Sequence, residues 1–215
     1  MIILAHRAQD HKAGSIPPRF GIEIDVRDHI GIPCVSHDPI YTGSAPTLGD
    51  WLKLDLQYGA RPAYAVNVKA DGIERQLVEI FKGYMAIREH AFFFDGSFPT
   101  MRRLRVLDAP TAERVSDEET WNGQSHIIWL DRWDWHGDFE YSPGPMPGRI
   151  YLPMHDRQGQ KTTAYAVSPE LHIANCQPSF RRYWWRRFRE MGCAGICTDH
   201  WLEAEEFLGG PGKSG

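Results

Sequence analysis

The sequence of 215 residues predicts an α/β fold, a compact (β/α)8 TIM barrel. Eight short apolar runs recur along the chain, and most are continuous rather than alternating, as in parallel strands covered on both faces. Helical patterns lie between many of these runs, and eight repeats of strand and helix are typical of a closed barrel. The expected strands are 2–5, 21–26, 63–68, 91–94, 104–107, 126–130, 163–167 and 194–198.

Helices are expected in four of the intervals between the runs. Thr47 is a residue type that caps a helix amino terminus, and Trp51 and Leu52 follow it on an apolar stripe. Asp71 is expected to cap a longer helix over 73–88. The other two candidates are 111–121 and 178–191.

Two segments depart from the regular alternation. Residues 8–20 contain a glycine and two prolines with little helical pattern, so the first connecting helix is expected to be reduced. Residues 132–162 are rich in Gly, Pro and Trp, which predicts a long loop over one end of the barrel. No linker divides the chain, so residues 1–208 are expected to form one domain, followed by a flexible tail over 209–215.

Composition and charge restrict the partners and the location. The net charge of −4 gives no general basic field, so no nucleic-acid partner is expected. No run of about 18 apolar residues indicates a transmembrane segment, and the apolar start of the chain is too short for a signal peptide. A cytoplasmic location is therefore expected, with the four cysteines as reduced core thiols. The oligomeric state does not follow from the sequence.

Polar and titratable residues follow almost every expected strand. Functional residues of (β/α)8 barrels gather at the carboxyl ends of the strands, so this pattern predicts a site at that end. The residues are His6 and Arg7, Glu23 and Asp25, Asn67 and Lys69, Asp95, Asp108, Asp131 and Arg132, Ser168, Glu170 and His172, and Asp199 and His200.

Two carboxylates form the centre of the expected site. Glu23 and Asp25 are two residues apart in a β-branched run, so in a strand both side chains lie on one face. Their hard oxygens, with the carbonyl oxygen of Asn67 from the next strand, suit Mg²⁺ or Ca²⁺. The alternatives are a solvated strand face for the carboxylates and a strand-end cap for Asn67.

Two histidines and two cations accompany the carboxylates. His6 and His37 titrate near neutral pH, so each can donate or accept a proton. Arg7 and Lys69 supply positive charge where an anion would bind. With a divalent cation this set suits cleavage of a phosphate ester, with one histidine deprotonating the nucleophile and the other protonating the leaving group. The alternatives are satisfied buried histidines and a surface ion pair for Lys69.

Four further strand-end residues are secondary site candidates, with loop solvation or helix capping as the alternative. They are Asp95, Asp131, Glu170 and His172. In the long loop, Trp133 and Trp135 are candidates either for substrate contact or for packing of the loop itself.

The ordered motifs resemble those of the glycerophosphodiester phosphodiesterase family, within the larger group of phospholipase-C-like phosphodiesterase barrels. They are His6-Arg7, Gly21-Ile-Glu-Ile-Asp-Val-Arg27, Pro33-Cys-Val-Ser-His-Asp38, Ala65-Val-Asn-Val-Lys69 and Gly195-Ile-Cys-Thr-Asp199. The resemblance implies metal-dependent hydrolysis of a small-molecule phosphodiester. It implies that His6 and His37 are the acid–base pair and that Glu23 and Asp25 bind the divalent cation.

The sequence departs from that family in three places. Asn67 stands where the family has a third acidic ligand. Either a weaker affinity for the metal or an additional contact of the ion with Glu170 or Asp95 is therefore expected. Ala8 replaces a glycine, and the family's Glu-Asn-Thr motif and helix are replaced by the short segment within 8–20. A differently shaped pocket is expected, which leaves a glycan-linked diester open as the substrate. Two other functions stay open: a degenerate barrel that binds a phosphate-bearing ligand, and a lyase that stops at a cyclic phosphate.

Overall fold

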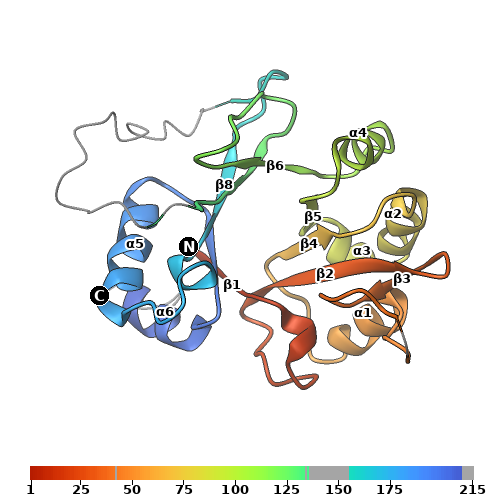
Figure 1. The fold of residues 1–215 in the computed structure, drawn as a ribbon, viewed down its shortest axis with the longest axis horizontal. Helices are drawn as coiled ribbons and strands as arrows, with labels where there is room; N and C mark the ends of the chain where they lie inside the picture. The colour runs from red at the N-terminus through yellow and green to blue at the C-terminus, as the bar shows by residue number, and fades with distance from the viewer. Residues whose placement is uncertain (42, 134, 136–154, 210–215) are drawn as a thin grey trace. The chain divides into compact units, whose positions relative to one another are not determined.

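The structure is a computed structural model that describes residues 1–41, 43–133, 135 and 155–209 (Figure 1). The chain divides into two compact units, which are described in turn. The N-terminal unit is residues 2–112, and the C-terminal unit is residues 113–215 together with Met1. In the part of the chain that is described, no helix is both long and apolar enough to cross a membrane.

The N-terminal unit contains a parallel sheet in the order β5-β4-β2-β1, with one antiparallel strand, β3, added to β2. Its strands are β1 (Ile2–Ala5), β2 (Gly21–His29), β3 (Ile32–Val35), β4 (Tyr64–Val68) and β5 (Ala91–Phe94). The register of β2 on β4 pairs Glu23 with Ala65 and Asp25 with Asn67. The two carboxylates of β2 therefore lie next to the polar end of β4.

Both faces of β2 are buried over residues 21–26. Ile22, Ile24 and Val26 are fully buried on one face, as expected for an apolar core. Glu23 and Asp25 lie on the other face and are only 2% and 1% exposed. The alternative of a solvated strand face is therefore wrong, because these carboxylates do not reach bulk water.

Helices and short turns connect the strands of this unit. They are η1 (Ala8–Asp10), α1 (Leu48–Leu56), α2 (Glu74–Lys82), α3 (Met85–Arg88) and α4 (Phe98–Val106). Thr47 caps α1 as predicted, since its side chain accepts the N–H of Asp50. The predicted cap at Asp71 is wrong: α2 starts after Ile73, and Asp71 accepts hydrogen bonds from the hydroxyls of Ser97 and Thr100.

The first connection is reduced to the three-residue helix η1, as predicted, and an arginine holds the rest of the segment. Arg61 is 3% exposed and donates to the backbone carbonyls of Ile16, Pro17 and Phe20. It also pairs with the carboxylate of Asp55 in α1, at 2.7 Å. These bonds hold the segment 16–20 against α1.

The expected strand over 104–107 and the expected helix over 111–121 are both wrong. Residues 104–106 belong to α4, and β6 is Ala112–Val115. Met101 and Leu104 are buried three residues apart, while arginines lie between and beside them, which is helical spacing. A run of four apolar residues is too short to distinguish that period from a strand. Asp108 consequently follows a helix rather than a strand.

The C-terminal unit continues the alternation of strands and helices, with the strand order β9-β8-β7-β6. Its elements after β6 are β7 (Ile127–Leu130), β8 (Thr163–Val167), η2 (Pro169–Leu171), α5 (Pro178–Glu190), β9 (Gly195–Thr198) and α6 (Trp201–Leu208). β8 is parallel to both β7 and β9. The helix predicted over 178–191 is confirmed by α5, in which Trp184, Trp185 and Phe188 are buried.

Most of the loop predicted over 132–162 lies outside the described residues, as does 210–215 of the predicted tail. In the described part, Trp133 is 44% exposed and Trp135 is buried. His155 and Lys161 form an antiparallel bridge before β8.

Candidate functional site

Glu23 has the most strongly perturbed carboxyl group of the predicted site. Burial and the neighbouring charge of Asp25 raise its pKa from 4.5 to about 7. His6, the backbone N–H of Arg7 and Lys69 act in the opposite direction and lower the pKa. Burial and the like charge of Asp25 make the ionised form of Glu23 unfavourable, so a bound cation would stabilise that form.

The turn after β1 brings Arg7 to Glu23. Arg7 has a left-handed backbone with φ of 47°, which costs a non-glycine residue about 1–2 kcal/mol. In this conformation its backbone N–H donates to Glu23 Oε2 at 2.9 Å. The preceding residue, His6, is half-buried at the end of β1. The strained turn therefore holds His6 and Arg7, which follow β1, close to the carboxylates of β2.

Both oxygens of Asp25 are engaged. Lys69 Nζ lies 3.2 Å from Oδ1, and Gln9 Nε2 donates to Oδ2 at 2.7 Å. The backbone N–H of Asp25 donates in return to Gln9 Oε1 at 3.4 Å. Gln9 was not predicted from the sequence; its only signal is its place in η1, directly after the His6-Arg7 motif.

Hydrogen bonds determine the protonation of His37. Arg7 Nη2 lies 2.8 Å from His37 Nε2, and Asp38 Oδ1 lies 2.8 Å from His37 Nδ1. An arginine can only donate, so Nε2 must accept and Nδ1 must carry the proton given to Asp38. His37 is therefore a neutral imidazole whose Nε2 lone pair points at the Arg7 guanidinium.

Arg27 links the histidine loop to the end of β4. Its Nε donates to the backbone carbonyl of His37 at 2.7 Å, and its Nη1 donates to that of Lys69 at 3.4 Å. Arg27 was missed by sequence reasoning. The available signal was the period of two along β2, which places Arg27 on the same face as Glu23 and Asp25.

Asn67 carries an oxygen without a hydrogen bond. Its side chain is 8% exposed, and Oδ1 has no hydrogen-bond partner among the residues that the structure describes. A buried acceptor without a donor is costly, which favours a ligand that supplies positive charge. With Glu23 and Asp25 it completes a set of hard oxygens, so these residues fit Mg²⁺ or Ca²⁺.

A site rich in acidic ligands is not present in the described ranges. Within residues 1–41, 43–133, 135 and 155–209, no three or more histidine, cysteine, aspartate or glutamate side chains are arranged to hold a metal ion. The candidate set contains two carboxylates and one amide. Asp95, a secondary candidate in the same unit, follows β5 in a left-handed conformation with φ of 59° and is half-buried.

The other three secondary candidates lie in the C-terminal unit. Asp131 follows β7, and its Oδ1 atom lies 2.6 Å from Nε2 of His172. Glu170 accepts hydrogen bonds from the hydroxyls of Ser168 and Thr198, one on each oxygen. The structure thus brings Asp131 and His172 together, and it satisfies Glu170 within a local network.

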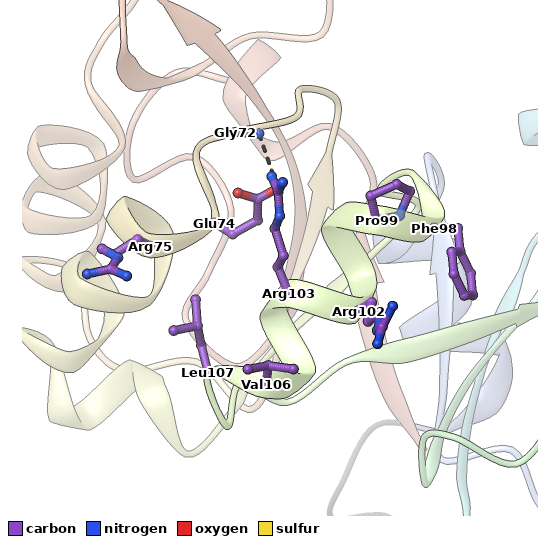
Figure 2. Close-up of a pocket in the computed structure, with 9 residues that line it drawn as sticks. All are labelled: Gly72, Glu74, Arg75, Phe98, Pro99, Arg102, Arg103, Val106 and Leu107. Carbon is purple, nitrogen blue, oxygen red and sulfur yellow. Dashed lines mark hydrogen bonds and ion pairs between the residues drawn. The ribbon is translucent and has the colours of Figure 1, made fainter.

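A separate surface groove of about 740 Å³ lies between α2 and α4 of the N-terminal unit (Figure 2). Arg103 reaches Glu74 at 3.5 Å, and Phe98 and Val106 are largely exposed along α4. None of the residues predicted for the site lines this groove, so its volume gives no support to the predicted chemistry.

Comparison with solved structures shows the fold of the whole chain. A protein assigned as a glycerophosphodiester phosphodiesterase from Galdieria sulphuraria matches with a TM-score of 0.65 and 11% identity, over 96% of this chain and 97% of that one. A glycerophosphoryl diester phosphodiesterase from Parabacteroides distasonis matches with a TM-score of 0.64 and 13% identity, over 96% and 85% of the two chains. A glycerophosphodiester phosphodiesterase from Agrobacterium tumefaciens matches with a TM-score of 0.64 and 13% identity, over 97% and 99%.

The chain is thus an α/β protein with the compact (β/α)8 barrel predicted from its sequence. It resembles the glycerophosphodiester phosphodiesterases in fold, which confirms the resemblance found in its motifs. No protein-family model matches the sequence, and no curated protein does so either.

Proposed function

We propose that this protein is a metal-dependent hydrolase of a small-molecule phosphodiester. The observation that carries the proposal is a pair of buried polar atoms without hydrogen-bond partners, one on Asn67 of β4 and one on Arg7 after β1. Asn67 Oδ1 is an acceptor without a donor, and Arg7 Nε is a donor without an acceptor among the described residues. A divalent cation bound to an anionic phosphodiester would satisfy both atoms.

Glu23, Asp25 and Asn67 would hold the cation, Mg²⁺ or Ca²⁺. When bound, such an ion polarises phosphoryl oxygens and stabilises their negative charge. Lys69 now neutralises Asp25 at 3.2 Å. The Lys69 side chain is about a quarter exposed, so in the complex its ammonium group would turn toward a phosphate oxygen.

His37 is proposed as the general base. Its neutral Nε2 carries the lone pair, and the Arg7 guanidinium covers that lone pair in the free protein. When Arg7 moves to the phosphate, Nε2 becomes available to take a proton from the nucleophile. His6 is proposed to protonate the leaving group, and acid–base catalysis of this kind contributes about 10²–10⁴-fold to the rate.

The substrate is proposed to be a glycerophosphodiester or a glycan-linked phosphodiester. The three structural neighbours are named for glycerophosphodiester hydrolysis, which supports the first class. Hydrolysis of both classes by the purified protein, with EDTA and with added Mg²⁺ or Ca²⁺, tests the proposal. Activity should require the cation and should disappear in His6→Ala and His37→Ala while both variants stay folded; full activity in both variants would contradict the mechanism.

A second candidate function is binding of a phosphate-bearing ligand without cleavage. The observation that favours it is the full occupation of Asp25 by Lys69 and Gln9, together with the amide at Asn67 in place of a third carboxylate. Diesters that raise the melting temperature without releasing product would support this function. If product forms, phosphorus NMR separates hydrolysis from a lyase reaction, because a lyase stops at the cyclic phosphate.

A further inference from the structure

A histidine–carboxylate pair lies at the carboxyl ends of β7 and β8, within the C-terminal unit, and the proposed reaction does not use it. Asp131 directly follows β7 and is 6% exposed. His172 directly follows η2, which begins two residues after β8. The 2.6 Å contact between His172 Nε2 and Asp131 Oδ1 fixes the orientation of the imidazole ring.

The pair also determines which nitrogen of His172 is available. Asp131 Oδ1 accepts the backbone N–H of Arg132 at 2.8 Å as well as the histidine contact, as an ionised carboxylate does. Nε2 of His172 therefore carries a proton, and in the neutral ring Nδ1 has the lone pair. No residue that the structure describes makes a hydrogen bond to Nδ1, and the side chain is 18% exposed.

An exposed tryptophan is fixed beside this imidazole. The ring centroids of Trp133 and His172 are 4.6 Å apart, and Trp133 is 44% exposed. Its backbone N–H donates to Asp117 Oδ1 at 2.8 Å, and the Arg114 guanidinium lies 5.3 Å from the ring centroid. A large aromatic ring that is held in place yet left exposed is typical of a surface that contacts a ligand.

The neighbouring Glu170 provides a contrast within the same unit. Both of its carboxylate oxygens accept hydroxyl groups, and one of those hydroxyls, of Ser168, accepts the indole N–H of Trp185 at 2.6 Å. That network gives each oxygen of Glu170 a partner within the unit. The contact between the ends of β7 and β8 needs only Nε2 of His172, so Nδ1 of the partly exposed imidazole and the exposed part of the Trp133 indole have no role in it.

We propose that Asp131, His172 and Trp133 form a binding site for a small polyol. Nδ1 accepts a hydrogen bond from a hydroxyl group, Asp131 keeps the ring in the required tautomer, and the indole of Trp133 covers the carbon skeleton. Residues at the carboxyl ends of barrel strands are the ones that contact ligands in this fold. The inference does not rest on the proposed function, because all three residues belong to the C-terminal unit.

Saturation-transfer NMR on the full chain tests the site directly, with glycerol, myo-inositol and a methyl glucoside as probes. At least one probe should bind, and its affinity should fall about tenfold in His172→Phe and in Trp133→Leu, as expected for a lost hydrogen bond or a lost apolar contact. His126→Gln, at the amino end of β7 in the same unit, is the matched control and should leave binding unchanged. Trp133→Leu leaves the Asp131–His172 pair intact, so it decides the outcome even where His172→Phe fails to fold.

The binding test does not depend on catalysis. If no probe binds the native protein, or if binding is unchanged in Trp133→Leu, the polyol site is wrong whatever the enzyme assay gives. If the probes bind as expected and no diester is hydrolysed, the proposed function fails and the polyol site stands.

Discussion

Arg7 contacts His37 through its guanidinium and Glu23 through its backbone. Nη2 lies 2.8 Å from His37 Nε2, and the backbone N–H donates to Glu23 Oε2 at 2.9 Å. One residue therefore connects the proposed base to the proposed metal ligand. Its two contacts are separable by mutation, because only the first belongs to the side chain.

Arg7→Lys is expected to lower kcat/KM for a phosphodiester by about 100-fold, a loss typical of one missing donor to a developing anion. Lysine keeps the charge and the backbone bond to Glu23 but loses the planar guanidinium that can reach both His37 and a phosphate. Steady-state kinetics measures the change. Arg88→Lys, at an exposed position in the same unit, is the control and should leave kcat/KM unchanged. If Arg7→Lys also leaves kcat/KM unchanged, the Arg7 guanidinium does not bind the phosphate.

The Glu23 carboxyl group should make the metal-free protein less stable as pH rises. Because its folded pKa of about 7 lies above the ordinary 4.5, the folded state binds more protons than the unfolded state between these values. The free energy of unfolding therefore falls as pH rises through this range, by up to about 3 kcal/mol from this group.

Urea unfolding in EDTA at pH 5 and pH 8 measures this effect by comparison of the native protein with Glu23→Gln. The variant lacks the titrating group, so it should lose less stability over the same interval and should be the more stable of the two at pH 8. An equal pH dependence in both proteins would show that Glu23 is not held protonated by its surroundings.

Arg61 is expected to be essential for the stability of the N-terminal unit. Arg61→Ala would leave the buried Asp55 carboxylate without its cationic partner, with only the Tyr64 hydroxyl donating to it, and would release the carbonyls of the segment after η1. Loss of one member of a buried ion pair costs about 3–5 kcal/mol. Urea unfolding measures this loss in the free energy of unfolding. Lys82→Ala is the control, because the exposed pair of Lys82 with Glu79 contributes less than about 1 kcal/mol.

The sequence predicted best those features that depend on local periodicity. The alternation along β2 correctly placed the two carboxylates on one face, and the continuous apolar runs indicated strands buried on both faces. The same reasoning failed over 104–107, where four apolar-rich residues fit a strand and a helix equally well. It also gave no sign of β3, whose residues include Pro33 within a four-residue strand.

Contacts between residues far apart in the chain were beyond local reasoning. Gln9 is 16 residues from Asp25, and only the folded turn after β1 brings their side chains together. Arg27 was on the predicted face, but its bonds to the carbonyls of His37 and Lys69 depend on where the later loops lie. The catalytic and metal-binding roles of the predicted residues stay predictions, since their geometry supports these roles without testing them.

Asn67→Asp is expected to tighten binding of Mg²⁺ or Ca²⁺ by about tenfold, because affinity for these ions rises with the number of charged oxygen ligands. Asn67→Leu should weaken binding of these ions, because it removes a buried oxygen that lacks a hydrogen bond among the described residues. Titration calorimetry measures both. Gln57→Glu adds the same charge at an exposed position of the same unit and should leave the affinity unchanged. If Asn67→Asp and Gln57→Glu have the same small effect, the added charge acts only at a distance and Asn67 is not a ligand.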